Sequence, residues 1–144
     1  MKTKILLSIL SIFFITVCYS QSPNYIWAKQ QNAGGTNDNF GSRITVDGNG
    51  NTIVLGGFKS PTITFGTTTL TNTDTNYYDI FIVKYDTNGN VLWAKQQDAG
   101  GTELDYGGSI SVDASENIIF TGIFESSSIT FGTTTLINAG FYDI

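Results

Sequence analysis

Alternating apolar and polar positions run through much of the chain and predict β-strands. In residues 42–47, Ile44 and Val46 fall on one face and polar side chains on the other. A returning strand is expected over residues 52–58, because the intervening Asp-Gly-Asn-Gly-Asn at 47–51 is typical of a hairpin turn. No stretch places apolar residues at helical spacing. The pattern therefore predicts an all-β protein.

A second pattern lies in residues 79–86, where Ile80, Phe81, Ile82 and Val83 make the strand apolar on both faces. Such a strand is expected inside a sheet that is covered on both sides. A turn at 86–90 leads into another strand at 91–96, and a Thr-rich hairpin at 63–72 separates the second strand from the third. Each unit thus has four main antiparallel strands and one added hairpin.

This unit occurs twice, at an offset of 66 residues. Residues 27–31, Trp-Ala-Lys-Gln-Gln, return at 93–97, and residues 63–70 return unchanged at 129–136. Between 27–72 and 93–138, 27 of 46 positions are identical, which establishes a tandem repeat. The second copy is then two residues shorter, so that Tyr-Asp-Ile at 78–80 matches 142–144.

Tandem four-stranded antiparallel sheets with two apolar faces are typical of β-propeller blades, because each blade packs against two neighbours. A β-solenoid or a sandwich is the alternative; solenoid coils are usually shorter and lack such frequent hairpin turns. We expect the last strand of a preceding blade at 25–31 within a segment 21–40, a first full repeat at 41–106 with its blade at 41–97, and a truncated second repeat at 107–144. Because residue 144 falls inside an expected strand, we expect an incomplete propeller of about one and a half to two blades, from a truncated product or fragment.

Residues 1–20 predict a signal peptide. Lys2 and Lys4 precede an apolar run at 5–15, and small residues at Cys18 and Ser20 suit cleavage after Ser20. Acylation of Cys18 is the alternative, although the bulky Val17 before it argues against a lipoprotein. The run is short for a membrane span, and no second segment is long enough to cross a bilayer. The predicted location is therefore extracellular or at the cell surface.

Composition excludes several function classes. The net charge is −5 with a pI near 4.3, and removal of residues 1–20 leaves 5 basic and 12 acidic groups, which disfavours nucleic acid as a partner. The chain has no His and one Cys, so Ser/His, Cys/His and zinc sites cannot be built. Without Cys18, no disulfide can form, and stability must come from packing and strand pairing.

The loops at 47–51 and 86–90 resemble the opening of a calcium loop, in which oxygen ligands alternate. The closing Glu is absent, because Phe58 and Gln97 stand eleven residues after Asp47 and Asp86, and the equivalent loop at 113–117 lacks the alternating Asn residues. We interpret these loops as structural turns and predict no metal site.

Other candidates also receive structural interpretations. Asp79 and Asp143 recur once per repeat, as do Asp47 and Asp113, which suits turn acceptors better than an acid/base pair. Trp27 and Trp93 are expected to pack between blades rather than to stack on sugars. The Thr-rich hairpins at 63–72 and 129–138 are either an adhesive rim or soluble edge strands. Ala-Gly-Gly-Thr at 33–36 lacks the Lys and helix of a phosphate loop. No catalytic residue and no cofactor are predicted.

Taken in order, these elements resemble the SBBP β-propeller repeat family. They are Trp27, 33–36, 44–47, 50–51, 56–58, 63–66, 78–86 and 88–95, and they cover nearly all of the chain after residue 20. The resemblance implies a secreted or cell-surface bacterial protein, often of Bacteroidetes-like organisms, built from many repeats and frequently ending in a sorting domain. It implies no activity of the repeat itself.

Three functional interpretations remain open. The first is a noncatalytic extracellular scaffold or adhesion module that binds an unknown protein or glycan, with the outer-membrane secretion machinery as a further partner. The second is an accessory propeller of a secreted enzyme whose catalytic domain lies elsewhere. The third is an enzyme in its own right, such as a carbohydrate-active hydrolase, which would need an asymmetric pair of carboxylates.

Overall fold

The computed structural model describes residues 24–97, 103–141 and 143–144, so the predicted signal peptide and its cleavage after Ser20 lie outside the described residues. The described part is all-β and contains no helix, hence none that could span a membrane. Its strands are β1 (Asn32–Gly34), β2 (Asn39–Val46), β3 (Thr52–Phe58), β4 (Thr62–Phe65), β5 (Thr68–Thr71), β6 (Asp79–Tyr85), β7 (Val91–Gln97), β8 (Asp105–Val112), β9 (Ile118–Phe124), β10 (Ser128–Phe131) and β11 (Thr134–Ile137).

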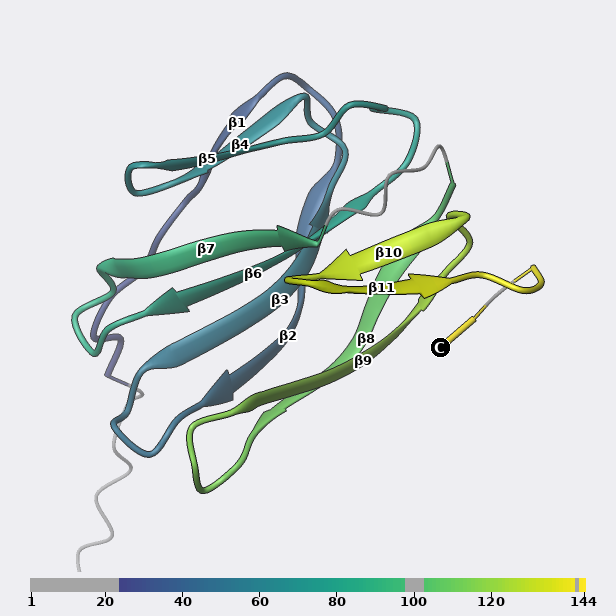
Figure 1. Ribbon diagram of the computed structural model, residues 1–144. Helices are drawn as coiled ribbons and strands as arrows, with labels where there is room; N and C mark the ends of the chain where they lie inside the picture. The colour runs from purple at the N-terminus through teal and green to yellow at the C-terminus, as the bar shows by residue number, and fades with distance from the viewer. Residues whose placement is uncertain (1–23, 98–102, 142) are drawn as a thin grey trace, which may run out of the picture.

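The first repeat forms one antiparallel sheet of four strands in the order β2-β3-β6-β7, hereafter the first blade (Figure 1). These are the four main strands that the alternation predicts. A bulge between Gly41 and Arg43 interrupts the pairing of β2 with β3. Gly56 lies opposite the bulge. A Cβ at this position would collide with the Phe40 carbonyl oxygen and the Phe81 ring, so the close approach of β2 and β6 to β3 requires glycine there.

The second repeat begins the same sheet again, hereafter the second blade. β8 pairs with β9 in the register of β2 and β3, with a bulge at the equivalent place, between Gly107 and Ser109. An isolated antiparallel bridge joins Phe124 to Asp143, as Phe58 pairs with Asp79 in the first blade. The repeat in the sequence is therefore a repeat in three dimensions.

Each repeat also carries the predicted hairpin, β4–β5 in the first and β10–β11 in the second. The first hairpin gains β1 as a third strand, in the order β1-β4-β5. The prediction of a strand at 25–31 is wrong: residues 24–31 form no strand, and the nearest strand pairs with β4 instead. A strand is defined by backbone hydrogen bonds to a neighbouring strand, and no strand of the described residues pairs with this segment.

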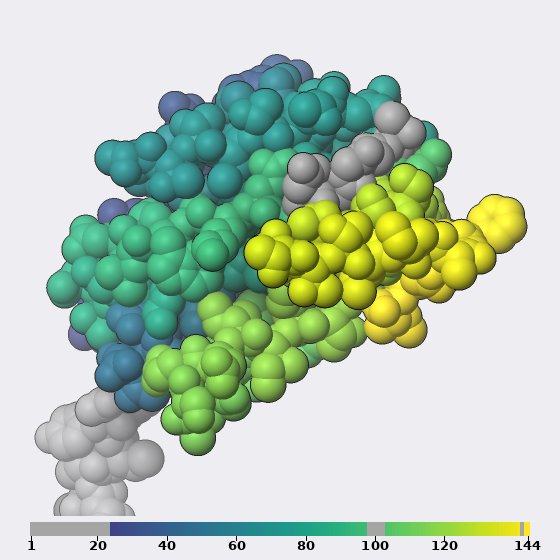
Figure 2. Space-filling model, viewed as in Figure 1, coloured from purple at the N-terminus to yellow at the C-terminus, as the bar shows by residue number. Residues whose placement is uncertain are grey.

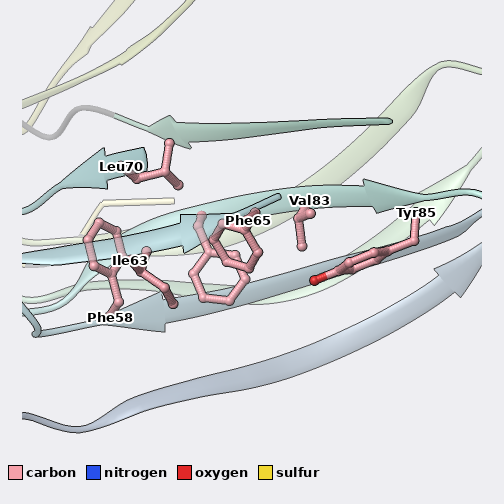
Figure 3. Packing of buried hydrophobic residues seen from close by; sticks show 7 residues of the cluster. Phe58, Ile63, Phe65, Leu70, Val83 and Tyr85 are labelled. Atoms are coloured by element: carbon pink, nitrogen blue, oxygen red, sulfur yellow. The ribbon is translucent and has the colours of Figure 1, made fainter. Parts of the chain in front are cut away.

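The inner strands of the first blade, β3 and β6, are buried on both faces, whereas Ile44 and Val46 of β2 are exposed. The hairpin face is covered by β4–β5, and Figure 3 shows its packing. This cluster comprises Phe58, Ile63, Phe65, Leu70, Phe81, Val83 and Tyr85. The opposite, inter-blade face presents Ile53, Leu55, Ile80 and Ile82 to the second repeat.

The hairpin face of the second blade lies against the inter-blade face of the first. Its contacting side chains are Ile110, Val112, Ile118, Phe120, Phe124, Ile129 and Phe131. The first strands of the two sheets approach closely, since Ser42 Oγ donates to the Gly107 carbonyl oxygen at 3.3 Å and the rings of Phe40 and Tyr106 stack at 5.8 Å. Sheets that meet at their first strands in this way are arranged as blades of a propeller.

The leucine pair Leu55 and Leu92 tests this burial. Leu55→Ala is expected to lower the free energy of unfolding by about 2–5 kcal/mol, because the side chain is fully buried between the blades. Leu92→Ala should cost less than about 1 kcal/mol, because Leu92 is 51% exposed on β7. Urea denaturation of both variants measures the difference, and equal losses would contradict the inter-blade packing.

Candidate functional site

The same five-residue turn closes three hairpins, starting at Asp47, Asp86 and Asp113. In each, one carboxylate oxygen accepts from the backbone N–H groups two and four residues on, and the other accepts from the side chain of the closing Asn, all at 2.8–2.9 Å. The Asn side chains and backbone amides lower the pKa of Asp86 and Asp113. The carboxylates thereby organise turns, in line with their structural interpretation.

Asp47 has an additional partner that joins the turn to the sheet. Its carboxylate lies 2.6 Å from the Lys84 ammonium, and its side chain has no exposed surface. Burial raises the pKa of Asp47, but the Lys84 ammonium and the N–H groups of Asn51 and Asn49 outweigh it, so the pKa lies far below its usual value. Asp47 is therefore a fixed anion, which cannot serve as a proton donor near neutral pH.

Glu116 brings the second blade into this cluster. One of its carboxylate oxygens accepts from the Gly48 N–H at 3.1 Å, and the other lies 3.9 Å from Lys84 Nζ. Glu116 has φ = 64° at the turn position where the equivalent Gly50 has φ = 80°. A non-glycine residue in this region costs about 1 kcal/mol or more, and here that residue makes both contacts to the first blade. The Lys84 cluster (Asp47, Lys84, Glu116) is therefore an inter-blade clamp.

A buried carboxylate lies at the other end of the second blade. Asp105 is 2% exposed, and it accepts from Ser126 Oγ at 2.8 Å and from the Ser126 N–H at 3.4 Å. In the first blade Asn39 takes this place and donates to Ser60 Oγ at 2.8 Å. Burial raises the pKa of Asp105, and the hydrogen bonds from Ser126 offset this only in part.

The two tryptophans pack at equivalent places. Trp27 contacts Tyr85, with ring centroids 5.5 Å apart, and belongs with Val54 to the hairpin-face cluster of the first blade. Trp93 packs against the inter-blade cluster, as does Phe120, the residue of the second blade equivalent to Val54. The segment 24–31 thus has the packing of a preceding blade's last strand without its hydrogen bonds.

A cleft of about 970 Å³ separates the blades beside Trp93. The first blade contributes Ile82 and residues 93–97, and the second contributes Ile118, Phe120 and Phe131. The equivalent space in front of the first blade, beside Trp27, is only about 250 Å³, because Phe81, Val83 and Tyr85 project into it. The cleft is therefore about four times as large as the equivalent space in the first blade.

The remaining predicted candidates have local roles. Asp79 accepts from Gln96 Nε2 at 2.6 Å, and Asp143 accepts from the Ala139 N–H at 2.7 Å. The segment 33–36 includes the end of β1 and no helix follows it. On each hairpin two threonine hydroxyls pair across the strands, Thr64 with Thr69 at 3.0 Å and Thr130 with Thr135 at 3.1 Å. In the described ranges, no three His, Cys, Asp or Glu side chains come together as a metal site would require.

Sequence reasoning missed two features of this site. It placed Asp47 in a turn but did not pair it with Lys84, and it gave Asp105 no role. A signal for the pair is present in the sequence, because Lys84 is the one charged residue between Ile80 and Tyr85 in an apolar strand. A buried cation in such a position requires an anionic partner.

Comparisons with known proteins agree with this architecture. A WD repeat-containing protein of Acanthamoeba polyphaga mimivirus, itself uncharacterized, is 32% identical over 117 residues, which is 78% of this chain and 8% of that protein. The chain is a β-propeller repeat protein. No family model matches it, and no solved structure matches it. The chain spans about 8% of the length of this relative, and both of its own tryptophans are followed by Ala rather than Asp.

Asp105→Asn tests the buried carboxylate. The amide is expected to raise the free energy of unfolding at pH 7 by about 1 kcal/mol, because burial disfavours the carboxylate form of Asp105 in the folded state and an amide carries no charge to desolvate. The raised pKa means that the folded state binds the proton more tightly, so the wild type loses stability as the pH rises through that pKa. The gain should therefore shrink below about pH 4, where the carboxyl is protonated in both states. Denaturation of both proteins at several pH values measures this, and a gain independent of pH would contradict it.

Proposed function

We propose that the chain is a noncatalytic, exported scaffold or adhesion module of the cell surface or extracellular space. The observation that carries this proposal is that the candidate carboxylates hold the fold together. Asp47, Asp86 and Asp113 each use both oxygens inside a turn, and Asp47 is also paired with Lys84. A hydrolase would need an accessible, asymmetric pair of carboxylates instead.

The hairpins provide the surface that suits binding. The yellow β10–β11 hairpin lies at the surface of the molecule in Figure 2, and Thr134 and Thr135 on it are exposed. Each hairpin carries one pair of threonine hydroxyls at the equivalent position, so the two repeats present the same hydrogen-bonding groups at two places. Repetition of one surface along an array of repeats favours a multivalent ligand, such as a glycan or an extracellular protein. The resemblance to SBBP repeats supports the same proposal.

Export is tested by expressing the full chain in a bacterial host. Export and cleavage after Ser20 should give a mature protein that begins at Gln21, as measured by intact mass. Leu7→Arg should reduce the exported amount about tenfold or more, because a charge disrupts the apolar run, whereas Leu7→Ile should have little effect. A lipid-modified protein that begins at Cys18 would replace the predicted cleavage site, whereas an uncleaved wild-type chain that stays inside the cell would contradict export itself.

Binding is tested by applying the purified chain to glycan and protein arrays. A scaffold should retain its ligand unchanged, and Thr69→Ala combined with Thr135→Ala should weaken retention several-fold, because both hydroxyls belong to the hairpin pairs. Thr87→Ala, an exposed position in the β6–β7 turn, serves as the control. Release of a cleaved product would instead establish a hydrolase.

A further inference from the structure

Two of the three Asp turns contain an Asn-Gly pair. Asn49 precedes Gly50 in the β2–β3 turn, and Asn88 precedes Gly89 in the β6–β7 turn. Both asparagines are exposed. The third turn, at 113–117, has the same hydrogen bonds from its closing Asn but Ser-Glu in place of the Asn-Gly pair. The chain thus contains the same turn with and without this pair.

An Asn-Gly pair can be modified without an enzyme. The backbone nitrogen of the glycine attacks the side-chain carbonyl carbon of the asparagine, and a new C–N bond forms. The side-chain amide nitrogen leaves as ammonia, which takes up the proton of the glycine N–H. Water then opens the cyclic imide at either carbonyl and gives aspartate or isoaspartate. Glycine allows this reaction most readily, because no side chain hinders the approach of its nitrogen.

The folded turns withhold the attacking nitrogen. The Gly50 N–H donates to the Asp47 carbonyl oxygen at 3.0 Å, and the Gly89 N–H donates to the Asp86 carbonyl oxygen at the same distance. A nitrogen held in this way is not free to attack the preceding side chain until the turn opens locally. The rate of reaction at each site therefore measures how often its own turn opens.

The neighbouring blade holds the first of these turns closed. The Gly48 N–H, one residue before Asn49, donates to a carboxylate oxygen of Glu116 at 3.1 Å. The β6–β7 turn is covered differently, because Trp27 lies so close to Gly89 that a Cβ there would meet its ring. Glu116 thus distinguishes two otherwise equivalent Asn-Gly pairs.

We propose that Asn49 is a deamidation site and that Glu116 of the second blade controls its rate. While the inter-blade clamp is closed, the turn opens rarely and the Asn49 amide persists. When the clamp is released, the turn opens more often, and Asn49 converts to aspartate and isoaspartate. This site is independent of the proposed adhesion function and of the threonine hairpins.

The modification weakens the clamp in return. Isoaspartate adds one methylene group to the backbone at residue 49. The Gly50 N–H and the Asn51 N–H both donate across this point to Asp47, at 3.0 and 2.8 Å. The longer backbone cannot keep both bonds, so Asp47 loses partners in the turn that carries the Lys84 contact. Deamidation at 49 and release of the clamp therefore reinforce each other.

The test is peptide mapping by mass spectrometry after incubation of the full chain at mildly alkaline pH. Glu116→Gly removes the clamping side chain and leaves the residue that the first blade has at this turn position, Gly50. It should raise the rate of deamidation at Asn49 about 2- to 10-fold, because the turn loses one restraining hydrogen bond. The rate at Asn88, measured in the same digest, should stay unchanged, which also shows that the variant is folded.

Two references complete the test. Glu116→Gln keeps an amide oxygen that can accept from the Gly48 N–H, so its rate at Asn49 should lie nearer to that of the wild type. In urea both Asn-Gly pairs should react faster than in the folded chain, and at similar rates. The proposal is overturned if Asn49 reacts as fast in the folded wild type as in urea, if Glu116→Gly leaves its rate unchanged, or if that variant accelerates Asn49 and Asn88 equally.

Discussion

The structure depends on one apolar contact, the layer in which the inter-blade face of the first sheet meets the hairpin face of the second. Ile53, Leu55 and Ile82 have almost no exposed surface, and what covers them comes from residues 110–131. A four-stranded sheet that is apolar on both faces cannot be buried by its own repeat alone. This requirement explains why the unit occurs in tandem. It also explains the glycine at 107, where a Cβ would collide with Leu55.

Much of this architecture follows from the sequence because the governing patterns are local. Alternation locates β2 and β3, and the double apolar pattern identifies β6 as an inner strand, which the sheet order confirms. The Asp-to-Asn spacing in the turns is also local, since each turn is closed by its own residues. These elements need no knowledge of distant contacts.

The errors and omissions arise where the partner lies far along the chain. Residues 27–31 have the same sequence as residues 93–97, which lie in β7, yet 24–31 form no strand. A strand is defined by its hydrogen-bond partner and not by its own residues. The pair Lys84 and Asp47 depends on the β3–β6 register, and Glu116 depends on how two blades meet. None of these relationships is periodic, so the repeat pattern does not contain them.

The two repeats differ at positions that contact a neighbouring blade. Leu55 is buried between the blades, and its equivalent in the second repeat is Thr121. Gly50 adopts the positive φ of the first blade's turn without strain. Glu116 adopts a positive φ at the equivalent position despite its side chain, and its carboxylate accepts a hydrogen bond from the Gly48 N–H of the neighbouring turn.

The Lys84 cluster shows the structural effect of having Glu116 where the first repeat has Gly50. Ion pairs with little exposed surface contribute less to stability than to the choice between alternative packings, since the desolvation of both charges offsets their attraction. Apolar faces alone can slide against each other with little change in buried area. A lysine that reaches a carboxylate in its own blade and another in the next favours one placement of the second blade. The hydrophobic layer therefore makes the blades associate, and the charged cluster at the turns selects their relative position.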